Sequence, residues 1–437
     1  MGSGSTLIPG NWSGWTNQRF GLRLPNIYRK WLVMNRLLVI AYYTPPLGLS
    51  GVMRITKLCK FLPDYGWQPV ILTVKPVAYY AYDPKLLADL NRAQIYRTES
   101  LDLNRLLRIF VKTGQRKIGS SAAGTGRLLN FILFPDAKIG WLPFAISAGK
   151  KIIAELKPQA VFATAPPWTA LLIGAQLAGY AGLPFIADFR DPWPAGFQTP
   201  PFYQQPALKK LLKNILTAAE LVLTVNPGTA ARLATVTTGK NAHLKKIKIL
   251  ENGFDPEDLM VQPEKLEGFS ILYAGNLYEN LAQIKGFIKA LSLVPEAKFY
   301  LAGEVDQKSR KMLSSHPQVV LLGRVTHSRV WALMKGADLL LYIGKPEQPV
   351  GLKLYEYLGA NRPILIWGDN EFEATELIKE FAAGRRCNDA ESLLNFIQEI
   401  KQNPNRFCEK DKTRLNRRFQ AEWLAQQLDQ IINSGNC

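Results

Sequence analysis

The sequence predicts an α/β protein made of two doubly wound parallel-sheet domains that face each other across a cleft. From Leu37 onward, short apolar runs alternate with amphipathic stretches, which is the pattern of repeated strand–helix–strand units. The same rhythm restarts after Lys248–Leu250, so a second sheet follows the first. The length of 437 residues also exceeds that of a typical single domain and favours two. A cleft between two such domains is a usual place for a ligand.

The first domain is expected to contain five buried strands, because near-continuous apolar runs are typical of parallel sheets covered on both faces. These runs are Leu37–Tyr42, Pro69–Val74, Ala160–Ala163, Pro184–Asp188 and Leu221–Val225. Between them, Val52–Leu62 and Trp168–Tyr180 have helical spacing. Residues 1–33 are rich in Gly, Ser and Asn and are expected to form a flexible extension, so we place the first domain at 34–260.

The second domain is placed at 261–413 and repeats the pattern. Its expected strands are Phe269–Ala274, Ala297–Ala302, Val319–Leu322, Asp338–Ile343 and Pro363–Trp367. Its expected helices are Leu281–Leu291, Ser328–Lys335, Leu352–Leu358 and Glu373–Phe381. Residues 414–437 form a last segment, in which Arg414–Ile432 carries apolar residues at helical spacing. Such a helix must pack on a domain that is already complete, and lying back across the first domain is one arrangement.

Composition limits the possible classes of function. Apolar residues make up 47% and charged residues 20% of the chain, which excludes long intrinsic disorder. The 54 Lys and Arg residues against 35 Asp and Glu give a net charge of +19, which favours anionic partners such as acidic lipid or a phosphorylated ligand. Four scattered cysteines without a CxxC pair, and three histidines, predict no metal site and a reducing compartment. No apolar run reaches the ~18 residues of a membrane span, so a cytoplasmic location is expected.

A glycine-containing loop follows the first expected strand. It runs from Pro45 to Gly51 and leads into a helix, so Gly48 and Gly51 would let backbone N–H groups approach an anion there. The loop matches neither GxGxxG nor GxxxxGK[ST], and a nicotinamide enzyme is disfavoured. An ordinary strand–helix turn explains the loop equally well.

Three charged residues lie at the end of the fourth expected strand or just after it. Asp188, Arg190 and Asp191 come where strand ends carry ligands in such sheets. Their groups would suit a polyhydroxylated acceptor or a developing positive charge. A local salt bridge combined with a helix cap is the alternative interpretation.

In the second domain, the candidate is the segment Gly351–Leu358. Lys353 and Glu356 are three residues apart, so they share one face of a helix. A lysine near phosphate and a carboxylate on a ribose diol would suit a nucleotide at this helix N-terminus. An isolated ion pair at this spacing is common and adds little stability.

Six segments, in order along the chain, resemble the motifs of glycosyltransferase family 4, a family of group 1 glycosyltransferases with the GT-B fold. The segments are IAYYTPPLGLSGVMR (Ile40–Arg54), ATAPPW (Ala163–Trp168), PFIADFRDPW (Pro184–Trp193), LENGFDPEDL (Leu250–Leu259), YAGNLY (Tyr273–Tyr278) and GLKLYEYLGANRPIL (Gly351–Leu365). The GT-B fold consists of two facing Rossmann-like domains with an interdomain cleft. It implies that the last helix crosses back to the first domain.

The resemblance also implies an activity and a set of site residues. It implies a metal-independent, retaining transfer from a UDP- or GDP-linked sugar, with no further cofactor. The residues that it places at the donor are Gly48, Gly51, Gly275, Asn276, Lys285, Gly351, Lys353 and Glu356. Those that it places at the reaction are Asp188, Arg190, Asp191 and Lys285. Within this set, Lys285 matches the phosphate-binding lysine and Glu356 the carboxylate that holds the ribose.

Some positions depart from the family pattern. Asn276 stands where an arginine is frequent, and Gln348 stands at the earlier acid of a paired-glutamate motif. Leu49 and Ser50 replace tandem glycines in the first loop. These departures motivate one alternative, a non-catalytic scaffold or partner of the same fold. A sugar-nucleotide epimerase with the GT-B fold is a third possibility.

The segment 101–134 is basic and amphipathic. Its apolar residues at helical spacing are Leu103, Leu106, Leu107, Phe110 and Val111, and its cations include Arg105, Arg108, Lys112, Arg116, Lys117 and Arg127. This pattern is typical of a helix that lies on a membrane surface, and a solvated helix covering the first sheet is the alternative. Lys209, Lys210, Lys213, Lys245, Lys246 and Lys248 add further charge. We therefore expect a glycan or lipid-linked acceptor at the inner face of an anionic membrane, and no nucleic-acid partner, because no stacking platform or DNA-binding motif is evident.

Overall fold

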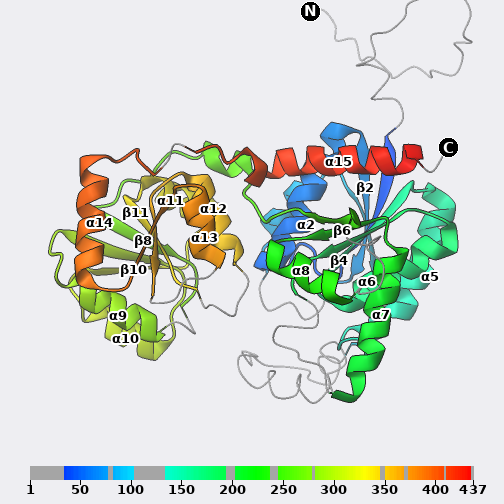
Figure 1. The fold of residues 1–437 in the computed structure, drawn as a ribbon, viewed down its shortest axis with the longest axis horizontal. Coiled ribbons are helices and arrows are strands. Elements are labelled where there is room, and N and C mark those ends of the chain that lie inside the picture. The colour runs from blue at the N-terminus through cyan, green and yellow to red at the C-terminus, as the bar shows by residue number, and fades with distance from the viewer. Residues whose placement is uncertain are drawn as a thin grey trace, which may run out of the picture.

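The computed structural model describes residues 34–76, 82–102, 133–192, 202–236, 245–277, 281–344, 350–368, 373–407 and 410–434. They form two α/β lobes side by side, each built around one parallel sheet (Figure 1). The fold class predicted from the apolar runs is therefore confirmed.

The first domain has a seven-stranded sheet in the order β3-β2-β1-β4-β5-β6-β7. Its strands are β1 (Asn35–Ile40), β2 (Trp67–Val74), β3 (Gln94–Thr98), β4 (Ala160–Ala165), β5 (Phe185–Phe189), β6 (Leu221–Thr224) and β7 (Ile247–Ile249). All pairs are parallel, and Ile40 of β1 lies level with Leu72 of β2 and Ala163 of β4. The chain order reverses at β1, so the carboxyl ends of β1 and β4 border the switch point where ligands bind in open sheets.

Helices cover both faces of this sheet. They are α2 (Ser50–Phe61), α5 (Leu142–Leu156), α6 (Trp168–Ala181), α7 (Gln205–Ala218), α8 (Pro227–Val236) and α15 (Arg417–Ser434), with short 3₁₀ turns η1 (Leu62–Tyr65) and η2 (Pro84–Leu90). Successive strand residues point to opposite faces. Leu38 and Ile40 therefore pack with residues of α5, α6 and α7, whereas Leu37 and Val39 pack with residues of α2 and α15.

The second domain has a six-stranded sheet in the order β10-β9-β8-β11-β12-β13. Its strands are β8 (Phe269–Ala274), β9 (Ala297–Ala302), β10 (Val319–Gly323), β11 (Leu339–Tyr342), β12 (Ile364–Trp367) and β13 (Gly384–Cys387). Its helices are α9 (Leu281–Leu291), α10 (Gln307–Ser314), α11 (His327–Gly336), α12 (Leu352–Ala360), α13 (Glu373–Glu380) and α14 (Ala390–Gln402). One apolar cluster joins the sheet to α11, α12 and α13, and a second joins its other face to α9, α10 and α14.

The chain crosses between the domains twice, and the two crossings lie side by side. The N–H of Phe254 donates to the carbonyl of Leu415 (2.9 Å), and the N–H of Arg417 donates to the carbonyl of Phe254 (2.9 Å). A Cβ at Gly253 would lie 2.0 Å from the Leu415 oxygen, so this close approach requires glycine. After the second crossing, α15 runs along the first domain, where it packs against α2 and η1 (Figure 1).

Two lysines of α2 anchor the first crossing to the first domain. Lys57 and Lys60 of α2 both reach the Asp255 carboxylate, at 2.7 and 2.6 Å. Lys57 also contacts Asp89 (2.9 Å), and Lys60 contacts Glu257 (2.7 Å). Two cations among several carboxylates hold the start of the linker against α2, because each charge that is removed from water has a partner of opposite sign.

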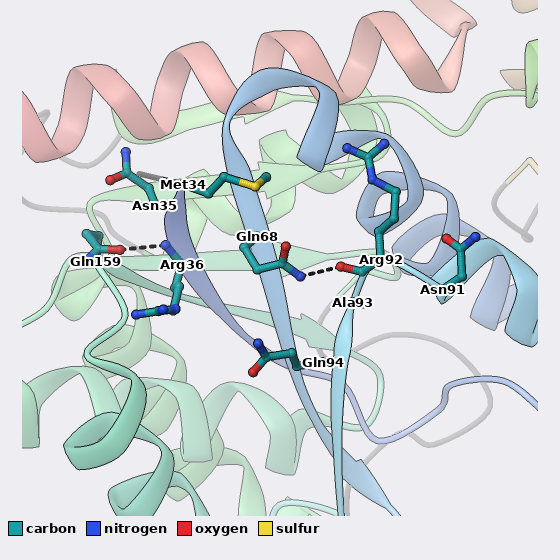
Figure 2. Close-up of a pocket in the computed structure, with 9 residues that line it drawn as sticks. All are labelled: Met34, Asn35, Arg36, Gln68, Asn91, Arg92, Ala93, Gln94 and Gln159. Atoms are coloured by element: carbon teal, nitrogen blue, oxygen red, sulfur yellow. Dashed lines mark hydrogen bonds between the residues drawn. The ribbon is translucent and has the colours of Figure 1, made fainter. Parts of the chain in front are cut away.

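A polar cavity of about 560 Å³ lies at the amino ends of β1, β2 and β3, away from the edge where open α/β sheets bind ligands (Figure 2). Its arginines already have partners: the Arg36 guanidinium donates to the Leu156 carbonyl (2.8 Å), and Arg92 pairs with Asp64 (2.5 Å). The Gln159 side chain accepts from the Arg36 N–H at 2.6 Å. We assign this cavity no role in ligand binding.

Candidate functional site

A close approach of backbone and lysine marks the carboxyl end of β8. Gly275 follows this strand with a φ of +137°, a conformation that L side chains rarely adopt. A Cβ at Gly275 would lie 2.5 Å from the Lys353 Nζ atom, and a Cβ at Gly303 would lie 2.1 Å from the Gly275 oxygen. Glycine at position 303 lets the two turns approach each other, and glycine at position 275 lets the ammonium of Lys353 lie beside this end of the sheet, 3.8 Å from the centre of the Tyr273 ring.

Helix α12 presents Lys353 and Glu356 on one face, as their spacing predicts. Gly351 is the N-cap of this helix, and both charged side chains are partly exposed. Burial lowers the pKa of Lys353 to about 8, although Glu356 opposes the shift. Burial also raises the pKa of Glu356 to about 7, and the nearby Asp258 adds to this effect. The cations that oppose the second shift are Lys353, Lys57 and Arg417.

The two groups therefore titrate close to neutral pH. A cation and a carboxylate on one helix face, next to a backbone free of side chains, can bind a ligand that combines a phosphate with hydroxyl groups.

Two other residues expected at the donor are placed less centrally. Asn276 accepts the backbone N–H of Glu304 with its Oδ1 atom (2.9 Å), so its side chain fixes the turns after β8 and β9. Lys285 lies in α9 with an exposed side chain, and within the described residues it makes no hydrogen bond or ion pair. Gln348, the other departure from the family pattern, lies outside the described residues.

Asp188, which was expected to carry a ligand at the end of its strand, is enclosed within the first domain instead. Asp188 belongs to β5 and is completely buried. Its carboxylate accepts from Arg54 Nη2 (2.8 Å) and from Thr164 Oγ1 (2.7 Å), so its role is to neutralise a buried guanidinium of α2. The salt bridge that the sequence left open as an alternative does exist, but its partner is 134 residues away in the chain.

Arg190 is also occupied, by carbonyl groups that hold two loops together. Its Nε donates to the Ala165 oxygen (3.1 Å), Nη2 to the Pro166 oxygen (2.5 Å) and Nη1 to the Gly51 oxygen. Arg190 therefore positions the loops after β1 and β4 rather than presenting its charge to a ligand. Its neighbour Asp191 is partly exposed, and burial raises the pKa of that carboxyl although Arg190 opposes the shift.

The two glycines of the first loop have different surroundings. A Cβ at Gly48 would lie 2.9 Å from the Asp83 Cβ, so glycine there permits close packing of the loop. Gly51 lies in the first turn of α2, where a Cβ would be 3.2 Å from Arg190 Nη1. Both glycines lie beside the carboxyl end of β1, on the side of the first domain where open sheets bind ligands.

Sequence reasoning missed two buried arginines between the domains. Arg54 donates to the carbonyl of Glu251 in the linker (2.9 Å). Arg417 is 1% exposed and donates to Gln420 Oε1 (2.7 Å), and burial together with the like charge of Arg54 lowers its pKa to about 9. Arg417 lies on the apolar face of its helix with Ala421 and Leu424. A cation at a position of the apolar pattern was the feature of the sequence that could have indicated a buried arginine.

The described residues contain neither a helix that could span a membrane nor a cluster of metal ligands. No helix among them is long and apolar enough to cross a bilayer. The same residues contain no cluster of three or more His, Cys, Asp or Glu side chains suited to a metal ion. The apolar residues and cations named for the basic amphipathic segment, from Leu103 to Arg127, lie outside the described residues. The same is true of the extension 1–33.

Comparison with known proteins gives a family match within the second half of the chain. Residues 268–403 match the family described as "Glycosyl transferases group 1", which confirms the resemblance predicted from the motifs at the level of group 1. No curated protein matches the chain in sequence.

Solved structures confirm the two-domain fold over 90–92% of the chain. A sucrose-phosphate synthase from Thermosynechococcus elongatus superposes with a TM-score of 0.61 at 16% identity and is covered completely. HepE of Anabaena in complex with UDP gives a TM-score of 0.55 at 15% identity, with 92% of this chain and 99% of that chain covered. A UDP-GlcNAc 2-epimerase from Methanocaldococcus jannaschii gives 0.55 at 13% identity, with 90% and 99% covered. At these identities the likeness shows a shared fold.

Proposed function

With residues 268–403 matching the group 1 glycosyltransferases, we propose that the protein is a retaining glycosyltransferase that uses a nucleoside-diphosphate sugar. The observation that carries the proposal is that Lys353 and Glu356 lie on one face of α12, next to the side-chain-free backbone at Gly275. These groups match the diphosphate and the ribose of such a donor in charge and in hydrogen-bonding type. The complex of HepE with UDP supports a UDP-linked donor over a GDP-linked one.

In the proposed reaction, the bond between the sugar and the diphosphate breaks, and negative charge grows on the leaving group. The ammonium groups of Lys353 and Lys285 and the backbone amides near Gly48 and Gly51 stabilise this charge electrostatically. A metal ion has no part in this scheme. Glu356 accepts hydrogen bonds from the ribose hydroxyls, which aligns the donor.

The acceptor hydroxyl attacks from the face that the diphosphate leaves, and a phosphate oxygen takes its proton, so the configuration of the sugar is retained. We assign Asp191 to orient acceptor hydroxyls, because its carboxylate is partly exposed at the carboxyl end of β5. Asp188 acts through Arg54, and Arg190 acts through the loops that it holds, so both are positioning residues.

We further propose that the acceptor is a glycan or a lipid-linked sugar in the synthesis of surface polysaccharide or glycolipid, met at the inner face of an anionic membrane. Support comes from α7, where Lys209, Lys210 and Lys213 are exposed while Leu208 and Leu212 are buried. A cation close to an anionic leaflet contributes about 1 kcal/mol, so several of them give reversible docking. Binding to vesicles with and without anionic lipid tests this part of the proposal.

Single substitutions at the donor test the central proposal. Glu356→Ala and Lys285→Ala should abolish the release of UDP from a UDP-sugar while the circular dichroism spectrum stays unchanged. Lys289→Ala is the matched control for Lys285, because Lys289 is exposed one turn further along α9. Unchanged turnover in both site variants would refute the proposal.

An epimerase is the second candidate, since a UDP-GlcNAc 2-epimerase shares the fold. It would convert a UDP-sugar without any acceptor, so analysis of the products separates the two activities. A non-catalytic scaffold is the third, motivated by Asn276 and Gln348. Calorimetric titration with UDP, GDP and ADP would then show no saturable heat.

A further inference from the structure

A hydrogen bond joins the two domains at a place remote in sequence from both covalent crossings. Asn226 Nδ2 donates to Glu373 Oε2 at 3.0 Å. Asn226 follows β6 of the first domain and is 6% exposed, whereas Glu373 is the first residue of α13 in the second domain. The bond therefore connects the carboxyl ends of the two sheets, where the proposed donor and acceptor meet.

The first-domain partner is held in place by its other side-chain atom. Asn226 Oδ1 accepts the backbone N–H of Thr229 at 2.7 Å, which satisfies a free donor in the first turn of α8. This bond orients the side-chain amide, so that its NH₂ group points to the second domain. The side chain of Asn226 is thus oriented to donate to the second domain.

The second-domain partner also contacts the donor helix. The backbone N–H of Val350 donates to the Glu373 carboxylate, and Val350 directly precedes Gly351, the N-cap of α12. The N–H of Gly351 donates to the Tyr342 hydroxyl at 3.3 Å. The entry to the helix that carries Lys353 is therefore tied through Glu373 to a residue of the first domain.

We infer that Asn226 and Glu373 form an interdomain latch, which holds the donor helix α12 at a fixed distance from the first domain. A bond between two domains shifts the balance of open and closed forms by the free energy that it contributes in the closed form alone. Glu373 acts through Val350 and Asn226, so it is a positioning residue. Only the catalytic consequence of the latch rests on the proposed function.

A swap of the two polar groups tests the latch without removing the helix cap. Asn226→Asp keeps the oxygen that caps α8 but places a carboxylate against Glu373, so like charges now meet. Glu373→Gln alone keeps an acceptor for both of its partners. In the chain with N226D and E373Q together, the amide at position 373 donates to the carboxylate at position 226, and the bond is restored with reversed polarity.

The distance between the domains is the first measurement, and it needs neither donor nor activity. Spin labels at cysteines introduced for Tyr180 and Leu293, which are 60% and 69% exposed, report one domain each. Cys408 and Cys437 are replaced by Ser in this chain. N226D should lengthen and broaden the distance distribution, and the double substitution should restore it. The latch is refuted if N226D leaves the distribution unchanged, or if the double substitution fails to restore it.

Transfer kinetics supply the second measurement. N226D should lower kcat/KM for transfer about tenfold, the effect of losing one hydrogen bond to a charged group, while the Kd of UDP stays within about twofold. Glu376→Gln is the control, because Glu376 is exposed one turn along α13. Failure of the wild-type chain to bind UDP, GDP or ADP would refute the proposed function, and the distance measurement would still decide on the latch.

Discussion

Replacing Glu356 by Gln should stabilise the second domain at alkaline pH and abolish the binding of UDP. Burial raises the pKa of Glu356 from 4.5 to about 7. The folded chain therefore holds this proton more tightly than the unfolded chain, and the resulting stabilisation is complete below pH 4.5 and lost as the pH rises through 7. A shift of this size corresponds to about 3 kcal/mol in the free energy of unfolding. Glutamine carries no charge at any pH and avoids this loss.

The variant and the wild-type chain should thus have similar stability at pH 5, and the variant should be up to about 3 kcal/mol more stable at pH 8. Urea unfolding at both pH values measures the difference, and amide hydrogen exchange of β8 and β11 separates the second domain from the first. Glu376→Gln on the exposed face of α13 is the control. A variant that gains no stability between pH 5 and pH 8 would show that Glu356 ionises without cost and would refute the reasoning.

Three other predictions follow from described contacts. UDP affinity should rise up to pH 7 as Glu356 ionises and fall above pH 8 as Lys353 loses its proton. Calorimetric titration with UDP from pH 6 to 9 checks this. In Lys353→Met the decrease in UDP affinity above pH 8 should disappear. Arg54→Met should destabilise the first domain by about 3–5 kcal/mol, because Asp188 stays buried without its cation; a urea midpoint equal to that of the wild type would contradict this. Lys57→Met should speed amide exchange in the linker while leaving β8 protected, and equal exchange in both chains would show that the linker needs no anchor.

The strands that the sequence predicts well are the central ones. The expected runs Phe269–Ala274 and Ala297–Ala302 coincide with β8 and β9, because a strand covered on both faces must be apolar throughout. Strands β3, β7 and β13 escaped prediction. They lie at sheet edges, where partly exposed residues such as those of Gly384–Cys387 leave no continuous apolar run.

The site was predictable where it depends on local spacing and unpredictable where it depends on distant pairing. Lys353 and Glu356 share a helix face because they are three residues apart, and this requires only that one helix forms. Asp188 ends a run that the sequence predicts as a buried strand, but its partner Arg54 comes from another element, so nothing near Asp188 in the sequence reveals how its charge is neutralised. The contact between Asn226 and Glu373 joins residues of two domains and had no sequence signal at all.

The path of α15 has a consequence for the order in which the protein is made. Ala421, Leu424 and Leu428 of this helix complete the apolar cluster that contains Leu37 and Val39 of β1. The first domain is thus discontinuous in sequence, and a ribosome must synthesise the whole second domain before α15 joins α2 in covering one face of the first sheet. Deletion of the eighteen residues of α15 should therefore expose apolar residues such as Leu37 and Val39 and destabilise the half of the molecule made earliest.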